Sequence, residues 1–183
     1  MRIEKLKKNF DIKVRLVHFP LHPETPAEGT SLSARGNDAA RKERQARMQG
    51  LMEAEGLPYG QRTHTYNSRL AQELGKWADT QEGGEALHDA IYRAYFVDGR
   101  NIGDAEVLVS LAQSVGLSAE DARKVLNERS FKTAVDQDWA TSRQIGVTGV
   151  PTFVAEGQGV VGCQPYEVLE QLMAASGAQR TGK

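Results

Sequence analysis

The segment "IGVTGVPTF", residues 145–153, places two glycines and a proline directly before a short apolar run. A proline at the start of a strand donates no ladder hydrogen bond, and the preceding Val150 is biased towards extended backbone. Because cis X-Pro bonds are the minority form in folded proteins, about 5–6%, these residues alone favour a trans proline at a strand end. The segment therefore predicts that a strand begins at Pro151 or immediately after it.

The residues that follow predict a hairpin and a closing helix. "PTFVAEG" and "GVVGC" are two short apolar segments on either side of the turn residues Glu156 to Gly159, which is the pattern of paired strands. Pro165 suits the first position of a helix, and Gly177 follows the expected end of that helix. The inner face of the helix is expected to comprise Val168, Leu169, Leu172 and Met173.

The N-terminal segment predicts a helix and then a strand. Ile3, Leu6 and Phe10 have helical spacing among lysines, which indicates an amphipathic helix. The segment "IKVRLVHF", Ile12 to Phe19, alternates side chains as a half-buried strand does, and Pro20 ends it. Residues 20–37 are rich in proline, glycine and small polar residues, so we expect a long loop there.

Residues 38–144 predict a helical lobe. Apolar stripes at helical spacing or helix-favouring compositions recur along this segment, at 41–55, 68–77, 86–96 and 108–115. Gly116 fits the position after a helix end, and Ser118 with Asp121 resembles a capping pair for the next helix. A segment of this length is too long for a loop, so it is expected to have a core of its own.

Composition restricts the classes of function. The chain has 183 residues, 39% of them hydrophobic, with a net charge of −1 and a sequence pI near 6.4. No overall attraction to nucleic acid or to an anionic membrane is expected from this balance. The sequence has neither the apolar run of a membrane span nor a signal peptide, which favours a cytoplasmic location.

Taken together, "GVTGVPTFV", the hairpin and "QPYEVLEQLM" resemble the C-terminal half of the thioredoxin fold as found in the DsbA family. More narrowly, they are similar to its FrnE-type and 2-hydroxychromene-2-carboxylate isomerase-like branch. "HFPLHPETP" and "YNSRLAQELGKWA" agree with this resemblance, which covers nearly the whole chain. It implies an α/β, thioredoxin-like fold made of residues 1–32 and 146–183, with an all-helical lobe inserted at 33–145.

The resemblance also implies a substrate site. In that family the proline is cis and places the preceding residue beside the reactive cysteine. Pro151 is therefore expected to be cis, and Val150 is expected to face the substrate. Thr152, His22 in the long loop and Asn67 in the lobe are the other expected substrate-binding residues. The implied partner is a thiol- or disulfide-containing protein or a small thiol such as glutathione, and no other cofactor is expected.

The sequence departs from the family at its start. Family members begin with a strand that leads into Cys-x-x-Cys at the N-terminus of the first helix, which stabilises a thiolate. This chain starts within the body of that helix, "RIEKLKKNF". The fold is thus expected to lack its first strand and the Cys-x-x-Cys region, with the catalytic nucleophile upstream of Met1. The unpaired strand edges left behind favour a homodimer or a longer protein.

Three functions remain open on these grounds: a thiol–disulfide oxidoreductase, a glutathione-dependent isomerase of the same fold, and a non-catalytic binding protein that keeps the substrate groove. Cys163 is the only cysteine in the chain. Because dithiol cycling needs a second sulfur, the chain is not expected to turn over dithiols by itself. Cys163 is the one available replacement nucleophile, but a structural or incidental thiol is the favoured interpretation, because lone cysteines usually behave as small apolar residues.

The remaining polar residues favour structural roles. The four histidines lack the spacing of a metal site, so no metal is expected. Asn67 and Ser68 are interpretable equally well as helix caps. Asp136 and Asp138 are two residues apart on a helix, which weakens an acid–base pair. Interspersed acidic residues favour a solvated helix face for the basic run Arg35, Arg41, Lys42, Arg44 and Arg47.

Overall fold

The computed structural model describes residues 2–33 and 38–182, so Arg35 of the basic run lies outside it. The chain forms two units, one of Met1–Leu21 with Asp138–Lys183 and the other of His22–Gln137. Residues 22–32, which the sequence assigns to the thioredoxin-like part, therefore lie in the second unit. The second boundary between the two units lies between Gln137 and Asp138, inside helix α7 (Lys132–Gln144).

The first unit contains the hairpin that the sequence predicts. Strands β3 (Thr152–Ala155) and β4 (Gln158–Val161) pair antiparallel, with Thr152 opposite Val161. The two residues between them, Glu156 and Gly157, both have positive φ, at 46° and 76°. Positive φ at both central residues is the geometry of a type I′ turn, whose twist matches that of the flanking strands.

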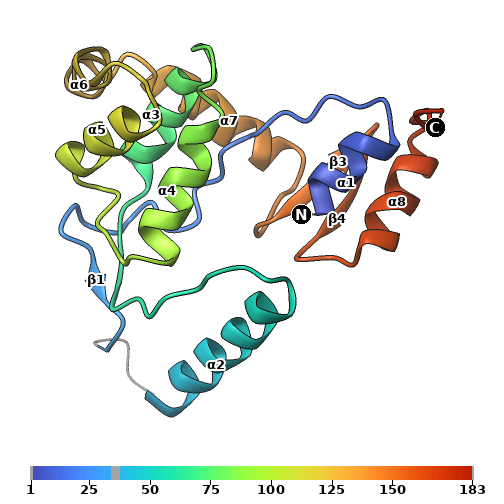
Figure 1. Ribbon diagram of the computed structural model, residues 1–183, viewed down its shortest axis with the longest axis horizontal. Helices are drawn as coiled ribbons and strands as arrows, with labels where there is room; N and C mark the ends of the chain where they lie inside the picture. Colours follow the sequence, from blue (N-terminus) through green and yellow to red (C-terminus); the bar gives the residue numbers. More distant parts are fainter. Residues whose placement is uncertain (1, 34–37, 183) are drawn as a thin grey trace. The chain divides into compact units, whose positions relative to one another are not determined.

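One face of this hairpin is covered by helices α1 (Arg2–Asn9) and α8 (Tyr166–Ala175), which lie together beside the strands in Figure 1. Leu6, Phe10 and Leu169 form the buried centre, against which Phe153 and Val160 pack. Because side chains alternate along a strand, the next residues point to the opposite face. There Val154 and Val161 are 48% and 53% exposed.

The strand predicted over Ile12–Phe19 is wrong, since residues 11–20 contain neither strand nor helix. Val14 and Leu16, which it would have buried, are 43% and 46% exposed. An alternating sequence forms a strand only where another strand satisfies its backbone groups. None of the strands that the structure describes pairs with this segment.

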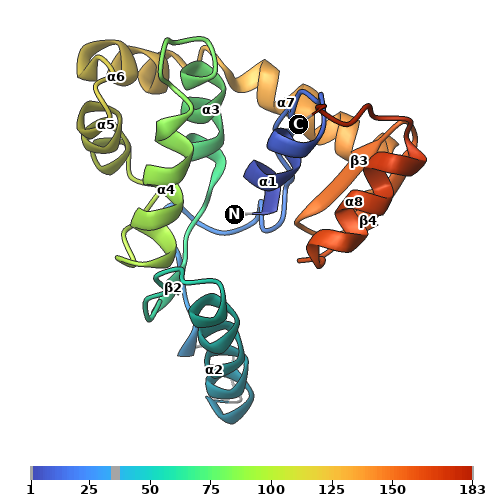
Figure 2. The same cartoon turned by 45° about the vertical axis from the view of Figure 1, so that its right-hand side comes forward.

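The second unit is predominantly helical, as predicted. Helices α3 (Arg69–Ala78), α4 (Ala86–Phe96), α5 (Ala105–Ser114) and α6 (Ala119–Glu128) surround one apolar core. Figure 2 shows these helices gathered around one another. Core side chains with 0% exposure include Leu74, Leu87, Leu108 and Ala122. No helix in the described ranges is long and apolar enough to cross a bilayer.

Local signals set the ends of these helices. The Asp104 carboxylate accepts the backbone N–H groups of Glu106 and Val107, and the Ser118 hydroxyl accepts that of Asp121, which satisfies donors that the first turn leaves unpaired. Gly116, with φ of 87°, follows the end of α5 as expected. Arg129 ends α6 in the left-handed region, with φ of 54°.

Helix α2 (Asp38–Ala54) belongs to the second unit but contributes no residue to the core. In the sequence it lies between β1 (Thr30–Ser31) and β2 (His64–Thr65), and these two strands pair with each other. The Leu32 N–H donates to the Thr63 carbonyl at 2.9 Å, which adds a hydrogen bond next to the β1–β2 pair. Within its unit, α2 stands apart from α3–α6 in both views (Figures 1 and 2).

Candidate functional site

The edge of strand β3 is the first candidate site. The Val150–Pro151 peptide bond is cis, in agreement with the expectation from the resemblance. The Gly162 N–H donates to the Pro151 carbonyl at 2.7 Å, so Pro151 lies opposite Gly162 in the hairpin register. The Thr152 hydroxyl donates to the Gly149 carbonyl at 2.6 Å and closes the turn before the strand.

The hydrogen-bond pattern decides which backbone groups are available. In an antiparallel pair, residues alternate between those that bond to the partner strand and those whose N–H and C=O point to the other side. Since Pro151 bonds to β4, Val150, Thr152 and Val154 direct their backbone groups away from it. No third strand of the described chain covers this edge, and Val150 is 50% exposed.

Cys163 follows β4 in the same unit and is exposed. The Arg2 guanidinium contacts it, with Nη1 3.1 Å from Sγ and 2.8 Å from the Gln164 carbonyl oxygen. This arrangement ties the start of α1 to the segment before α8. Sequence patterns could not have found the pair, because the two residues are far apart in the chain.

His22 and Asn67 lie in the second unit, whereas Val150, Pro151 and Thr152 lie in the first. His22 is partly exposed, and its Nδ1 is 3.5 Å from a Glu24 carboxylate oxygen. The Asn67 amide donates to the Thr25 carbonyl at 2.6 Å and accepts the Arg69 N–H at 2.8 Å. The Asn67 side chain therefore connects the loop at Thr25 to the start of α3 at Arg69.

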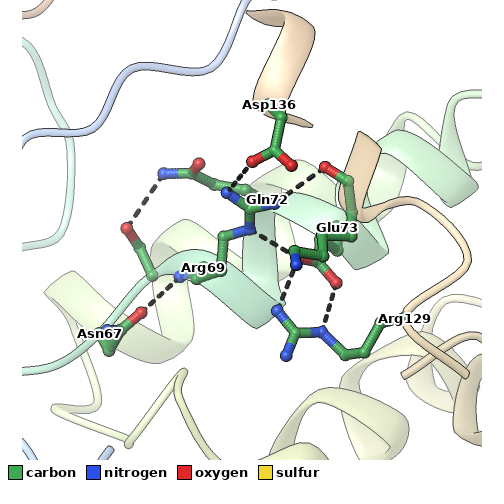
Figure 3. A network of polar contacts seen from close by, with 8 residues as sticks. Asn67, Arg69, Gln72, Glu73, Arg129 and Asp136 are labelled. Atoms are coloured by element: carbon green, nitrogen blue, oxygen red, sulfur yellow. Dashed lines mark hydrogen bonds and ion pairs between the residues drawn. The ribbon is translucent and has the colours of Figure 1, made fainter. Parts of the chain in front are cut away.

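The helical unit also contains a network of charges, shown in Figure 3. Its centre is Glu73 on α3, whose side chain is 0% exposed. Arg129 donates to both carboxylate oxygens of Glu73, at 2.7 and 2.8 Å, and Arg69 donates to one of them at 2.6 Å. Arg69 also pairs with Asp136 of α7 at 2.8 Å.

The network shifts the pKa values of its members. Burial alone would raise the pKa of Glu73, but hydrogen bonds and charge from Arg129 and Arg69 outweigh burial and lower it. The hydrogen bond from Arg69 lowers the pKa of Asp136. Glu73 therefore remains a carboxylate inside the unit and joins α3 to the end of α6, and Arg69 links it to α7.

Comparison with known proteins places this geometry in a family. The model of the DSBA-like thioredoxin domain matches residues 1–174. The chain belongs to the DSBA-like thioredoxin domain family. The α/β thioredoxin-like fold with a helical insertion is thereby established.

A solved structure described as a "probable DsbA oxidoreductase" from Streptomyces coelicolor has a TM-score of 0.87 at 30% identity, and the match covers 100% of this chain and 85% of that one. A 2-hydroxychromene-2-carboxylate isomerase structure has a TM-score of 0.73 at 19% identity, over 96% of this chain and 85% of that one. At that identity it shows a shared fold. Both structures agree with the DsbA and isomerase-like branch that the sequence resembles.

Two curated relatives match part of the chain. The uncharacterized protein YwbO of Bacillus subtilis is 27% identical over 112 residues, 61% of this chain and 56% of the relative. The ClpXP adapter protein SpxH of Halalkalibacterium halodurans is 27% identical over 118 residues, 61% of this chain and 38% of the relative. The match thus spans about half or less of the length of these two relatives.

The charge network is the feature that sequence reasoning missed. One signal for it was present, because Arg69 and Glu73 are four residues apart on a predicted helix and can pair. Nothing in the sequence indicates that Arg129 would complete the pair from another helix. Asp136 and Asp138 do have different partners: Asp138 accepts the backbone N–H of His18 at 3.0 Å, in the first unit.

Proposed function

We propose that this chain provides the substrate-docking edge of a DsbA-family thiol–disulfide oxidoreductase of the FrnE-like branch. The observation that carries the proposal is the edge of β3, where Val150, Thr152 and Val154 direct backbone groups away from β4. Family membership and the 30% identity to the Streptomyces coelicolor protein support the reaction class.

The edge recognises its substrate as an added strand. An extended peptide that carries a cysteine aligns antiparallel to residues 150–154 and forms main-chain hydrogen bonds with them, which is a general mode of peptide recognition. The exposed Val150 and Val154 side chains give this strand apolar contacts. The same edge accepts glutathione as a small thiol.

The role proposed for this chain is substrate binding, because the complete sulfur chemistry needs more than one thiol. A dithiol cycle forms a mixed disulfide that a second thiolate must resolve. This chain has one cysteine. The exchange step therefore needs a second sulfur that the single cysteine of this chain does not supply.

A proline substitution tests the docking edge. Val154→Pro removes one outward N–H and adds a ring where a peptide would pair, while the bonds between β3 and β4 are kept. We expect peptide binding to weaken by about tenfold, since one main-chain hydrogen bond and close approach are lost. Binding is measured by NMR titration of the isotope-labelled chain with an extended, reduced, cysteine-containing peptide.

Val161→Pro is the matched control. Val161 lies opposite Thr152 and directs its backbone N–H away from β3, to the other side of β4. This variant should bind the peptide as the unmodified chain does. Equal binding by all three proteins, or shifts outside residues 149–155, would overturn the proposal. A titration with glutathione alone shows whether a tripeptide suffices for binding.

A further inference from the structure

The unit that contains the β3–β4 hairpin has a small core. Among the described residues its buried apolar side chains are Leu6, Phe10, Leu169 and Leu172, and the other buried apolar side chains lie in the helical unit. Units with so small a core are commonly completed by oligomerisation. The hairpin unit also has large apolar side chains that are at least 43% exposed: Val14, Leu16, Leu21, Ile145, Val150, Val154 and Val161.

The edge of β3 lacks the usual protection against pairing. Val150, Thr152 and Val154 direct their backbone groups away from β4, and these groups have no hydrogen bond within the described residues. Native proteins usually protect such an edge with charged side chains, a bulge or a proline. Here the three outward positions are uncharged, and Pro151 faces β4, where its carbonyl accepts the Gly162 N–H. The outward register therefore keeps all of its donors.

The outer edge of β4 is a poorer template for an added strand. Its outward positions are Gly159 and Val161, and glycine weakens a strand. Gly162, with φ of 90°, follows the end of β4. Arg2 contacts the next residue, Cys163, at 3.1 Å and so occupies the end of this edge. A strand added to the hairpin is therefore expected at β3.

We propose that this added strand is β3 of a second copy of the chain. Two copies related by a two-fold axis at Thr152 have antiparallel β3 strands and form an isologous pair. Thr152 then lies opposite the second copy's Thr152, and Val150 lies opposite the second copy's Val154. Residues opposed in this way exchange both of their hydrogen bonds. Cross-strand pairs of β-branched side chains stabilise a sheet further.

The side chains select this register. A two-fold axis at Phe153 would place Val150 opposite Glu156, the charged first residue of the turn. The axis at Thr152 keeps every outward pair uncharged and brings together Val150 and Val154, which are 50% and 48% exposed in the single chain. Because an isologous pair is closed, it covers the β3 edges of both copies and does not continue into a fibre.

The second copy and a substrate peptide use the same backbone groups of β3. Dimerisation therefore closes the docking edge, and a peptide binds only to the single chain. This consequence rests on the function proposed above, whereas the pairing of two β3 strands does not. Self-association makes substrate binding depend on the concentration of the chain.

Sedimentation velocity from low-micromolar to submillimolar concentration tests the pairing. The unmodified chain should pass from monomer to dimer within this range. Val154→Pro removes an outward N–H and adds a ring, and in an isologous interface the change acts twice. It should raise the dissociation constant of the dimer by about a hundredfold. Val161→Pro alters only the outer edge of β4 and should dimerise within about twofold of the unmodified chain.

Circular dichroism melts establish that both proline variants fold. An unmodified chain that stays monomeric throughout the range would overturn the proposal. Equal loss of dimer in the two folded variants would also overturn it, because the interface would then not be specific to β3.

Cross-linking tests the register. In a Cys163→Ser background, Thr152→Cys places two thiols opposite each other, with Cα atoms about 5.5 Å apart, which is within the range of a disulfide. Oxidation with copper phenanthroline should link the two copies, whereas Val161→Cys in the same background should remain unlinked. A Thr152→Cys chain that sediments as a dimer but forms no disulfide would overturn the pairing about Thr152.

The reduced cysteine-containing peptide separates this proposal from the docking function. Dissociation of the dimer as the peptide binds residues 150–154 supports both. A dimer that persists with the peptide bound there would overturn the position of the second copy. A peptide that does not bind the single chain contradicts the docking function, and sedimentation and cross-linking then decide the dimer by themselves.

Discussion

Glu73→Gln is expected to lower the free energy of unfolding by about 3–5 kcal/mol, because it removes the shared anionic partner of two arginines inside the helical unit. The Glu73 carboxylate has no exposed surface, and Arg69 and Arg129 both donate to it. Glutamine fills the same volume, so the loss measures the charge and its hydrogen bonds, with no cavity added. Two positive groups would remain against a neutral amide.

Urea denaturation, followed by circular dichroism and tryptophan fluorescence, measures this change. The control is Glu106→Gln, whose carboxylate pairs with Arg123 on the surface at 2.7 Å and is 71% exposed. Exposed ion pairs contribute little to stability, so this variant should unfold with the unmodified chain. If Glu73→Gln unfolds at the same urea concentration as the control, the charge network does not stabilise the folded chain and the prediction is wrong.

The same carboxylate makes stability depend on pH in a known direction. The folded pKa of Glu73 lies below its ordinary value of 4.5. At acidic pH the unfolded chain therefore binds more protons than the folded chain does. The free energy of unfolding decreases as the pH falls. The stabilisation is fully present above the ordinary value and is lost as the pH falls through the folded pKa. Glu73→Gln should show a smaller loss of stability over the same acidic range.

Gly84→Ala is expected to destabilise the helical unit by about 2–3 kcal/mol or more. Gly84 is buried where α3 gives way to α4, and a Cβ atom there would lie 1.8 Å from the Ala78 carbonyl oxygen. That contact is with backbone, so no side chain can move aside. The turn between the two helices would have to open, which would disturb the packing of Leu87 in the core.

Gly50→Ala provides the comparison for Gly84→Ala. Gly50 lies within α2, and a Cβ atom added there meets nothing within 4 Å. Alanine favours a helix over glycine by about 0.8–1.0 kcal/mol, so this variant should be at least as stable as the unmodified chain. Thermal melts of both variants measure the difference. A Gly84→Ala melt at or above the temperature of the unmodified chain would contradict the close approach of Gly84 to the Ala78 carbonyl.

The helices of the second unit could be predicted because each signal was local. Leu70, Leu74 and Trp77 recur at helical spacing, and their side chains meet the core as that spacing requires. Ser118 and Gly116 carry end signals that depend only on nearby backbone groups. The β3–β4 hairpin was predictable for a similar reason, since its turn and both strands lie within a few residues of one another.

The failures concern contacts between distant parts of the chain. The alternation from Ile12 to Phe19 was real, but whether it forms a strand depends on a partner that the segment itself does not specify. Arg129 could not be assigned to Glu73 from spacing, because 56 residues separate them. The cis form of the Val150–Pro151 bond was predicted from the family resemblance. The residues of the segment 145–153 alone favoured the trans form.

Arg129 combines two of these features in a way that constrains how the sequence can change. It ends α6 with a left-handed backbone, which costs a side-chain-bearing residue about 1–2 kcal/mol and costs glycine almost nothing. The arginine is tolerated there because its guanidinium reaches Glu73. Once Glu73 is replaced by a neutral residue, that compensation disappears and glycine becomes the better residue at 129. In evolutionary terms the two positions are epistatic, and the order in which they change decides whether the intermediate protein is stable.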